Sequence, residues 1–522
     1  MATKQQVMGN LVWRFLERFG ASLVSFVVQI VIARLLSPEH YGTIALVSVF
    51  ITILNVFVDS GLGNALIQKK DADSLDFSTV FYTNLVFCTV LYLFLFFIAP
   101  LIASFYENDS LTDIIRVLGI TILISGVKNI EQAYVSAKMI FKKFFFATLA
   151  GTVIAAVVGI ALAYNGFGVW ALVAQQLINA GIDTIVLWFT VKWRPTWEFS
   201  FQRLKNLFGF GWKLLVSSLL DTVYNQLRQL IIGKKYTDAD LGYYNKGKQI
   251  PEFVISNVNS SIDSVLFPTM SQVQNDAKKV KEITRKSIKV SLYIIAPMMI
   301  GMAAVAENMI RLLLTDKWVS ATVYLQIFCF SFILYPIHTA NLNAIKAMGH
   351  SDYFLALEVV KKIMGIGILL VTMWFGPVWI AFGMIVSGFL SQFINSFPNR
   401  KLLNYSFLEQ IRDILPTFLL AGAMGGIVYA MNYIPVLPYW AVLILQIVSG
   451  ILVYWLGSVL FKNDTYRYLL DTGKQMIGNR KNKKSFDGNE SSCENPDDVR
   501  ISSSGSENQD SQKEENENHH PE

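Results

Sequence analysis

Long apolar stretches recur along most of the chain, and they constrain its fold more than any other feature. A helix needs about 20 mainly apolar residues to cross the roughly 30 Å hydrocarbon layer of a bilayer. About fourteen such stretches can be counted, at 11–33, 41–67, 79–101, 113–135, 144–164, 168–190, 209–232, 250–272, 287–311, 320–345, 354–375, 377–397, 412–431 and 438–461. Because 53% of the residues are hydrophobic and 16% are charged, we expect an all-α, polytopic membrane protein.

Other architectures fit this pattern poorly. A membrane β-barrel would show short segments of alternating polarity, whereas residues 85–98 are continuously apolar. The first apolar stretch lacks the charged, apolar and small-residue order of a cleaved signal, so we expect it to be retained. The net charge of +6 does not indicate a nucleic-acid partner, because the basic residues lie in short loops, where they set orientation in the membrane.

The distribution of basic residues predicts an inner-membrane protein with both termini in the cytoplasm. The loops assigned to the cytoplasm hold Lys69, Lys70, Lys138, Lys142, Lys192, Arg194, Lys278 and Arg285. No Lys or Arg lies close to the opposite loops, around Tyr106, Asn165, Pro377 and Pro435. Four lysines break the rule and either cap helix ends or belong to a transport path: Lys234, Lys235, Lys246 and Lys248.

The sequence also repeats itself at an offset of 200 residues. Residues 29–34 (QIVIAR) lie over residues 229–234 (QLIIGK). The match continues past the end of the apolar stretch, with Gly42 over Gly242 and Asp59 over Asn259. Two similar bundles related in this way can rock about a central cleft and expose it to each side of the membrane in turn.

The repeat divides the chain into parts. We predict two pseudo-symmetric six-helix lobes over 1–200 and 201–400, and two accessory helices over 401–465. Residues 478–522 are rich in Ser, Asn, Asp, Glu and Lys and nearly lack aromatic residues, so we expect a disordered cytoplasmic tail. This tail either docks partners or is dispensable.

Polar residues follow one face of four of the apolar stretches. A charged side chain in hydrocarbon costs roughly 2.5 kcal/mol or more, so its placement is informative. The first two stretches carry stripes at helical spacing, Arg14, Arg18, Ser22, Ser25 and Gln29, then Ser48, Thr52, Asn55 and Asp59. Their repeat mates carry Lys213, Asp221, Asn225, Arg228 and Gln229, then Glu252, Asn259 and Asp263. We predict that these stripes line a common, water-accessible cavity that binds substrate.

Simpler interpretations stay open for several of these residues. Arg14 and Lys213 lie near the cytoplasmic boundary and could snorkel to the membrane surface. Asp221 and Arg228 could pair with each other or act as a gate. Lys128 and Glu131 are three residues apart, as are Glu358 and Lys361, so we expect each pair to neutralise itself. Asp183 has no evident partner and could be a proton or cation site.

Two segments of the first 70 residues resemble a known protein family. Residues 34–42 (RLLSPEHYG) and 59–68 (DSGLGNALIQ) resemble the polysaccharide and lipopolysaccharide biosynthesis transporters, the Wzx-type flippases of the multidrug/oligosaccharidyl-lipid/polysaccharide exporter superfamily. The resemblance implies a two-lobed fold and translocation of an undecaprenyl-diphosphate-linked oligosaccharide by alternating access. It also implies that Arg14 and Arg18 meet the diphosphate, with Lys213 and Arg228 as further candidates.

The resemblance bears on cofactors, partners and rival functions. It implies no enzyme chemistry and no cofactor, with coupling to H+ or Na+ through Asp59, Asp221 or Asp263 left open. The expected partners are the lipid-linked glycan, membrane lipid and, through the tail, a polysaccharide polymerase or glycosyltransferase. A multidrug exporter of the same superfamily would need an acidic cavity, against the arginines of these stripes. A membrane glycosyltransferase would need a longer loop than any in the sequence.

Overall fold

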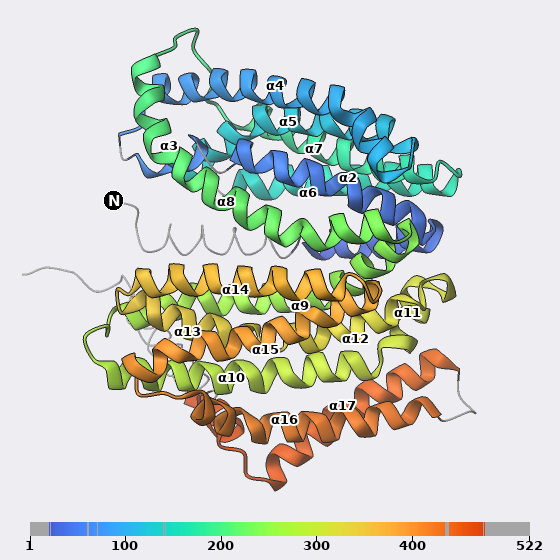
Figure 1. Cartoon of the computed structure of the whole chain (residues 1–522), viewed down its shortest axis with the longest axis vertical. Coiled ribbons are helices and arrows are strands. Elements are labelled where there is room, and N and C mark those ends of the chain that lie inside the picture. The colour runs from blue at the N-terminus through green and yellow to red at the C-terminus, as the bar shows by residue number, and fades with distance from the viewer. Residues whose placement is uncertain are drawn as a thin grey trace, which may run out of the picture. The chain divides into compact units, whose positions relative to one another are not determined.

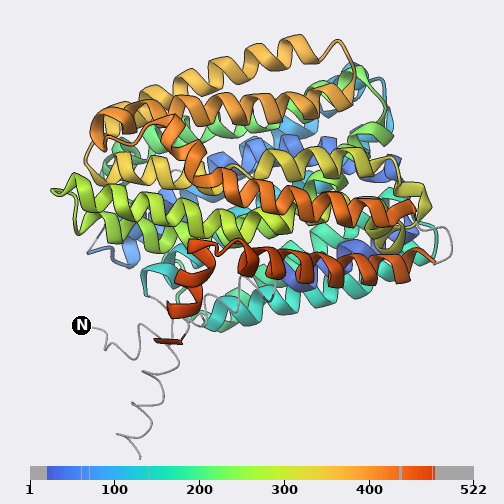
Figure 2. The same cartoon turned by 90° about the horizontal axis from the view of Figure 1, so that it is seen from below.

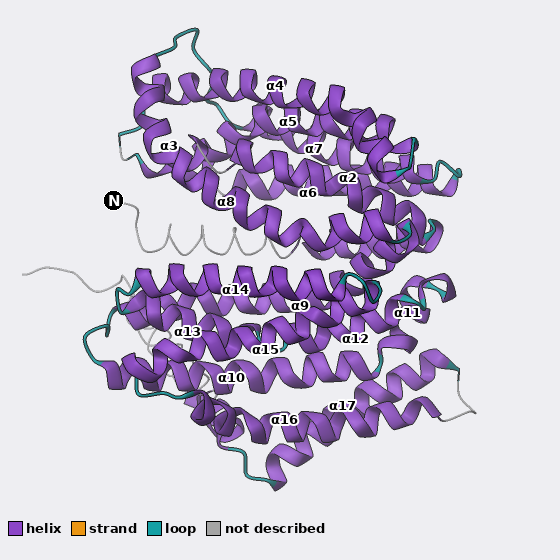
Figure 3. Ribbon diagram, in the orientation of Figure 1, coloured by secondary structure: helices purple, strands orange, loops and turns teal. Residues whose placement is uncertain are grey.

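The computed structural model describes a helical membrane protein. It describes residues 20, 22–59, 62–69, 71–138, 140, 142–433, 438–472 and 474–475. Within these ranges every regular element is a helix and none is a strand (Figure 3). The expected all-α class is therefore confirmed.

Helices follow one another with short connections. A first helix, Ser22–Leu35, precedes the others. The remaining elements are α2 Pro38–Asp59, α3 Leu62–Gln68, α4 Ser74–Tyr106, α5 Ser110–Ala137, α6 Lys142–Tyr164, α7 Val169–Thr190, α8 Phe201–Lys235, α9 Asp238–Ser271, α10 Ala277–Ala304, α11 Ala306–Leu314, η1 Asp316–Trp318, α12 Ala321–Phe332, α13 Tyr335–Ala347, α14 Ser351–Thr372, α15 Pro377–Leu402, α16 Phe407–Ala430, η2 Met431–Tyr433 and α17 Tyr439–Leu460.

Ten of the described helical segments are long and apolar enough to cross a membrane, and they coincide with ten of the expected crossings. Three other expected crossings are α8, α9 and α14, which are 35, 34 and 22 residues long. Their length suits a crossing, but their charged residues lower the hydropathy. Part of the remaining crossing, 11–33, lies outside the described residues.

The sequence repeat is visible in the helix boundaries. The first helix ends at Leu35 and α2 begins at Pro38, while α8 ends at Lys235 and α9 begins at Asp238. Both copies thus break and resume at the same offset of 200 residues. The second start is reinforced by a capping box, in which Thr237 and Asp240 satisfy each other's backbone N–H groups.

The first helix of each copy contacts the other copy. Helix α8 packs mainly on α2, α3 and α4, and Figure 1 shows it beside the earlier helices. In return, the first helix contacts later elements, with Phe26 stacked on Phe253 of α9 and the Trp318 indole N–H donating to the Ala33 carbonyl at 2.8 Å. Among helices α2 to α17, the most extensive pair between the two copies is α2 with α9.

The helices after α9 form a second bundle, and two further helices cover it. Helix α9 packs against α12 and α13, and α16 packs against α10 and α17 (Figure 2). A buried amide network joins α16 to this bundle, since Gln410 Oε1 accepts from Asn341, Gln392 and Ser396 at 2.9, 2.9 and 3.1 Å. Residues 466–522 form a separate unit. The expected tail, 478–522, lies outside the described residues.

Candidate functional site

A polar cavity lies where the first helix, α2, α7, α8 and α9 meet. Its volume is about 330 Å³, and six glutamines contribute to its wall. The lining residues are Gln29, Tyr41, Ile44, Ala45, Ser48, Val49, Thr52, Leu172, Gln175, Gln176, Gln226, Gln229, Asn245, Lys246, Lys248, Gln249 and Glu252. A glutamine side chain offers both hydrogen-bond donors and an acceptor. The wall is therefore suited to a ligand rich in hydroxyl groups.

The most buried charge of this cavity is Lys246, which is only 4% exposed. Its ammonium donates to Gln29 Oε1 at 3.1 Å and to Gln249 Oε1 at 2.9 Å. It also lies 4.1 Å from the centre of the Tyr41 ring, a cation–π contact. These partners are all neutral.

The other charged groups of the lining neutralise each other. Lys248 and Glu252 form an ion pair at 3.5 Å, one helical turn apart on α9. On α8, the Gln229 amide donates to Gln226 Oε1 at 2.7 Å. Among the described lining residues, Lys246 is therefore the ionisable side chain without a charged partner.

Two glycines bring the first turns of α2 and α9 together, next to the cavity-lining Tyr41. A Cβ added at Gly42 would lie 1.7 Å from the Asp238 carbonyl oxygen, and one at Gly242 would lie 2.1 Å from the Pro38 carbonyl oxygen. The two positions are repeat mates, so each copy of the motif presses its glycine against the first turn of the other. Only glycine permits this backbone approach. We call this contact the glycine closure.

Polar contacts surround the glycine closure. The Asp238 carboxylate accepts from Thr43 Oγ1 at 3.1 Å and from Asn108 Nδ2 at 3.0 Å. The first helix is tied to the second copy as well, because Arg34 donates to the Leu313 carbonyl at 2.8 Å and Lys317 donates to the Arg34 carbonyl at 2.7 Å. Contacts from both copies thus join the first helix, α2 and α9 at this end.

Of the predicted site residues, the structure brings three into the cavity wall. These are Gln29 of the first helix, Thr52 of α2 and Glu252 of α9. Ser48 and Gln229, which belong to the same stripes, join them. Arg14 and Arg18 lie outside the described residues. The predicted meeting of polar faces from both copies is therefore seen, with α7 as an additional wall.

The polar residues further along α2 and α9 do not line this cavity. Asp59 accepts from Asn129 of α5 at 2.6 Å. Its repeat mate Asn259 accepts from Thr339 of α13 at 2.9 Å, and Asp263 accepts from Asn343 of the same helix at 2.6 Å. These contacts, one in the first copy and two in the second, thus stay within each copy's own bundle.

The remaining predicted residues are dispersed. On α8, Asp221 pairs with Lys362 of α14 at 2.9 Å and accepts from Asn225, while Arg228 is buried against the Tyr224 ring. The alternative of an Asp221–Arg228 pair is therefore wrong. Four others are not among the cavity's lining residues: Ser22, Ser25 and Asn55, which are half-buried, and Lys213, which is exposed.

Several cavity residues were not predicted. Gln175 and Gln176 come from α7, where Gln176, Asn179 and Asp183 recur at helical spacing but were not included in the prediction. Gln226 and Gln249 each precede a predicted stripe residue, Gln229 and Glu252, by three residues, so they extend the predicted faces by one turn. Lys246 and Lys248 did leave a signal, since they broke the distribution of basic residues. The structure places these two lysines inside α9 and in the cavity wall, whereas Lys234 and Lys235 lie in the last turn of α8.

The internal ion pairs partly differ from expectation. Glu358 and Lys361 pair at 2.6 Å, as predicted. Lys128 instead pairs with Asp183 of α7 at 2.5 Å, and Glu131 lies 3.7 Å from Arg194. The prediction that Lys128 and Glu131 neutralise each other is wrong, because α7 and the connection that follows it supply the partners. The same contact gives Asp183 the partner that the sequence did not reveal.

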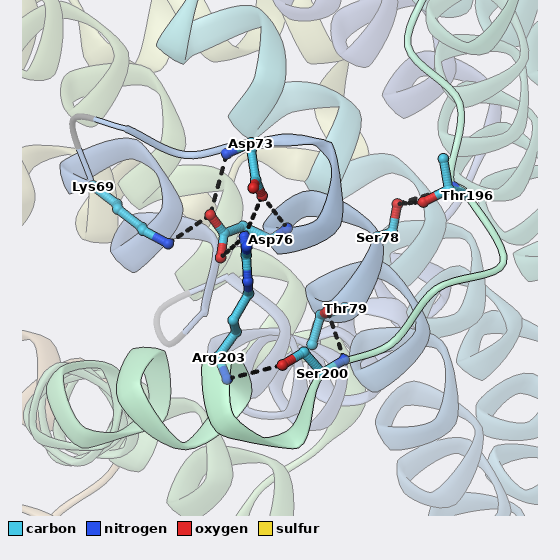
Figure 4. A network of polar contacts seen from close by, with 8 residues as sticks. All are labelled: Lys69, Asp73, Asp76, Ser78, Thr79, Thr196, Ser200 and Arg203. Carbon is cyan, nitrogen blue, oxygen red and sulfur yellow. Dashed lines mark hydrogen bonds and ion pairs between the residues drawn. The ribbon is translucent and has the colours of Figure 1, made fainter.

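A polar cluster fixes the start of α8 to the start of α4 (Figure 4). Arg203 pairs with Asp73 and lies 3.2 Å from Asp76, and the Ser200 N–H donates to Thr79 Oγ1 at 3.2 Å. The Arg203 guanidinium holds the pKa of the Asp73 carboxyl well below its usual range. We call this cluster, Asp73, Asp76, Thr79, Ser200 and Arg203, the α4–α8 clamp.

Next to the clamp lie two apolar grooves. They have volumes of about 590 and 390 Å³ and share Thr83, Phe87 and Leu204. Most of the remaining wall is apolar, including Tyr82, Trp197, Phe199, Phe57, Phe201, Phe208 and Trp212, and Lys205 lies in the wall of the smaller groove. Their chemistry contrasts with the glutamine-lined cavity and suits hydrocarbon chains.

Relatives of the chain carry names from polysaccharide synthesis. It is 26% identical to the succinoglycan biosynthesis transport protein ExoT of Rhizobium meliloti over 60% of this chain and 64% of that protein. It is 22% identical to the teichuronic acid biosynthesis protein TuaB of Bacillus subtilis (82% and 89% covered). It is 21% identical to the lipopolysaccharide biosynthesis protein WzxC of Escherichia coli (81% and 89% covered).

Solved structures show the same fold. The inward closed conformation of the lipid II flippase MurJ aligns with a TM-score of 0.71 at 16% identity, covering 88% of this chain and all of that one. An inward-facing multidrug resistance transporter of the MATE family aligns with a TM-score of 0.58 at 16% identity, covering 74% and 96%. The transporter fold expected from the sequence is thereby confirmed.

One protein family matches a long continuous part of the chain. Residues 31–323 match the family described as polysaccharide biosynthesis protein. This range includes the first helix from Val31, the glycine closure and the whole of α2 to α11, so it contains nearly every element of the cavity. Because the match spans more than half of the chain, the protein belongs to the polysaccharide biosynthesis protein family.

Proposed function

We propose that this protein is a flippase that moves a polyprenyl-diphosphate-linked oligosaccharide across the cytoplasmic membrane without chemical change. The observation that carries the proposal is the glutamine-lined cavity with its buried lysine, enclosed by helices of both sequence copies. Glutamine and asparagine side chains hydrogen-bond sugar hydroxyls well. The relatives named as a transport protein and as a flippase support the same class of function.

The alternative is a multidrug exporter for organic cations, supported by the fold of the MATE transporter. A site for such cations needs uncompensated carboxylates or open aromatic faces. Here Glu252 is paired with Lys248, and Lys246 lies over the ring of Tyr41. The described lining therefore holds a lysine without a charged partner and no unpaired carboxylate, which favours an anionic ligand.

The two kinds of surface suit the two halves of the substrate. The polar cavity would hold the oligosaccharide, while the apolar grooves beside α4 and α8 offer a place for part of the prenyl chain. We assign the diphosphate to Arg14 and Arg18 on the resemblance to related flippases, with Lys213 near the same surface. Only the head group has to leave water, because the lipid part of the substrate stays in the bilayer.

Transport would follow alternating access. With both termini in the cytoplasm, the glycine closure lies at the outer face and seals the cavity there. Opening requires α2 and α9 to separate at Gly42 and Gly242, and the α2–α9 pair is the most extensive contact between the two copies. Coupling to H+ or Na+ would fall on Asp59, Asp221 or Asp263, each of which has a defined partner to exchange. The tail would contact the polymerase or glycosyltransferase machinery.

The test fills the cavity. In cells that depend on this protein for surface polysaccharide, Ser48→Trp places an indole in the cavity wall. We expect lipid-linked glycan to accumulate on the cytoplasmic side and exposure to an external lectin to be lost. Phe189→Trp, at a position that is 80% exposed on α7, is the matched control and should export normally. Normal glycan exposure in a folded Ser48→Trp protein would contradict the proposal.

A further inference from the structure

Lys246 is a buried cation without an anionic partner. Within the described part of the chain, no Asp or Glu forms an ion pair with it, and its ammonium contacts only two amide oxygens and a phenol ring. The other charged members of the wall, Lys248 and Glu252, form an ion pair with each other. Lys246 and both of its glutamine partners are nevertheless among the residues that line the cavity.

Burying an ammonium without a counter-ion costs free energy, and a bound anion would offset that cost. Removing an ammonium from water costs several kcal/mol after relaxation, and neutral hydrogen bonds recover only part of that cost. A buried charge without a protein counter-ion is therefore an incomplete pair. An anionic oxygen group entering the cavity would complete it with charge-assisted hydrogen bonds.

The position of Lys246 distinguishes two possible sources of this anion. It follows Asp238, at the closed end of α9, by eight residues, or about 12 Å of helix, and the remaining 25 residues to Ser271 extend about 37 Å the other way. A diphosphate attached to a lipid stays near the membrane surface where the head group enters. The sugars farthest from the lipid reach the closed end first.

We infer that Lys246, with Gln29 and Gln249, forms a subsite for the carboxylate of an acidic sugar in the oligosaccharide. This inference rests on the proposed function and names its substrate class. The two glutamines hold the ammonium in place while their amide nitrogens offer donors to the same carboxylate. The name of one relative, a teichuronic acid biosynthesis protein, is consistent with an acidic cargo for a protein of this family.

The experiment compares two probes in vesicles that contain the purified full chain. Both are fluorescent undecaprenyl-diphosphate disaccharides, one ending in glucuronic acid and the other in glucose, and dithionite quenches them only in the exposed leaflet. We expect Lys246→Gln to slow transfer of the glucuronic acid probe by at least about tenfold, the loss expected for one charge-assisted hydrogen bond. Transfer of the glucose probe should change little, which also shows that the variant is folded.

Two further variants sharpen the result. Lys246→Arg keeps the charge and should retain most of the acidic transfer, whereas Lys279→Gln makes the same chemical change at an exposed residue beside Asp276 and should affect neither probe. Equal slowing of both probes by Lys246→Gln would assign the lysine to the diphosphate and overturn the inference. Unchanged transfer of both probes would also overturn it but leave the flippase function intact. Transfer of neither probe by the unmodified protein would instead contradict the proposed function.

Discussion

At the scale of single residues, two glycines determine how closely the sequence copies approach. Gly42 and Gly242 face carbonyl oxygens of the opposite first turn at distances that no side chain tolerates. The sequence repeat placed the two glycines in register but did not show that they meet. Their meeting depends on the crossing of α2 and α9, which a single sequence does not encode in any local pattern.

Gly42→Ala should therefore open the glycine closure. The added methyl group forces α2 away from the Asp238 carbonyl, a strain of about 1–3 kcal/mol by analogy with overpacked cores. A cysteine placed at Ser48 in the cavity wall should then react faster with a membrane-impermeant maleimide added outside. Gly367→Ala, which has open space around it on α14, is the control. Equal labelling in both backgrounds would refute the close approach.

A second residue-scale prediction concerns Lys128 and Asp183. The Asp183 carboxylate is 7% exposed and depends on Lys128 for its charge partner. Lys128→Met should reduce the free energy of unfolding by about 3–5 kcal/mol, because a buried charge is left unpaired. The double variant Lys128→Met/Asp183→Leu should recover most of this loss. Thermal unfolding in detergent measures both, and equal instability of the single and double variants would contradict the pairing.

At the scale of elements, the connection into α8 is fixed by the α4–α8 clamp. Arg203 lowers the pKa of Asp73, so the clamp contributes stability at neutral pH. This contribution is complete above the usual carboxyl pKa of about 4. It is lost only as the pH falls through the lower pKa of the folded state.

Arg203→Ala should release the start of α8. We expect faster amide hydrogen exchange over 200–205 at neutral pH, and only a small change in global stability, because Arg203 and Asp73 are partly exposed. Between pH 7 and 5 the unmodified protein should keep its protection, since Asp73 stays ionised. Loss of protection already near pH 5 would show that the pKa of Asp73 is not lowered.

The accessory helix α16 depends on a buried polar seam. Gln410 is fully buried and accepts three hydrogen bonds from α13 and α15. Gln410→Leu should leave Asn341 and Gln392 short of a partner and lower the free energy of unfolding by about 1–3 kcal/mol. Leu408→Gln, at an exposed position of the same helix, should have little effect in the same thermal measurement. A stable Gln410→Leu protein would show that the seam is dispensable.

Elements were more predictable from sequence than sites. The lengths of the apolar stretches predicted the membrane crossings. The sequence repeat indicated that the helices ending at Leu35 and Lys235 break at equivalent positions. The stripes correctly indicated that α2, α8 and α9 share a polar space with the first helix. They did not reveal which residues face it, because Asp59 and Asp263 turn to α5 and α13 instead. That choice is set by the rotation of each helix against its neighbours.

At the scale of the whole molecule, the account requires the glycine closure to open in every cycle. Cysteines replacing Thr43 and Asp238, whose side chains lie 3.1 Å apart, should allow a short cross-linker to join α2 to α9. Cross-linking should stop transfer of lipid-linked glycan, and cleavage of a reducible linker should restore it. The double variant without cross-linker is the control, and undiminished transfer in the cross-linked protein would exclude this gate.

The most direct test of the central claim measures what the protein carries. Vesicles containing the purified full chain would hold a fluorescent undecaprenyl-diphosphate-linked oligosaccharide, and parallel vesicles a cationic dye. The account predicts that the protein moves the glycan lipid between leaflets and that Ser48→Trp abolishes this movement. It also predicts that the dye leaves these vesicles no faster than it leaves protein-free vesicles. Efflux of the dye without transfer of the glycan lipid would contradict it and identify a cation exporter.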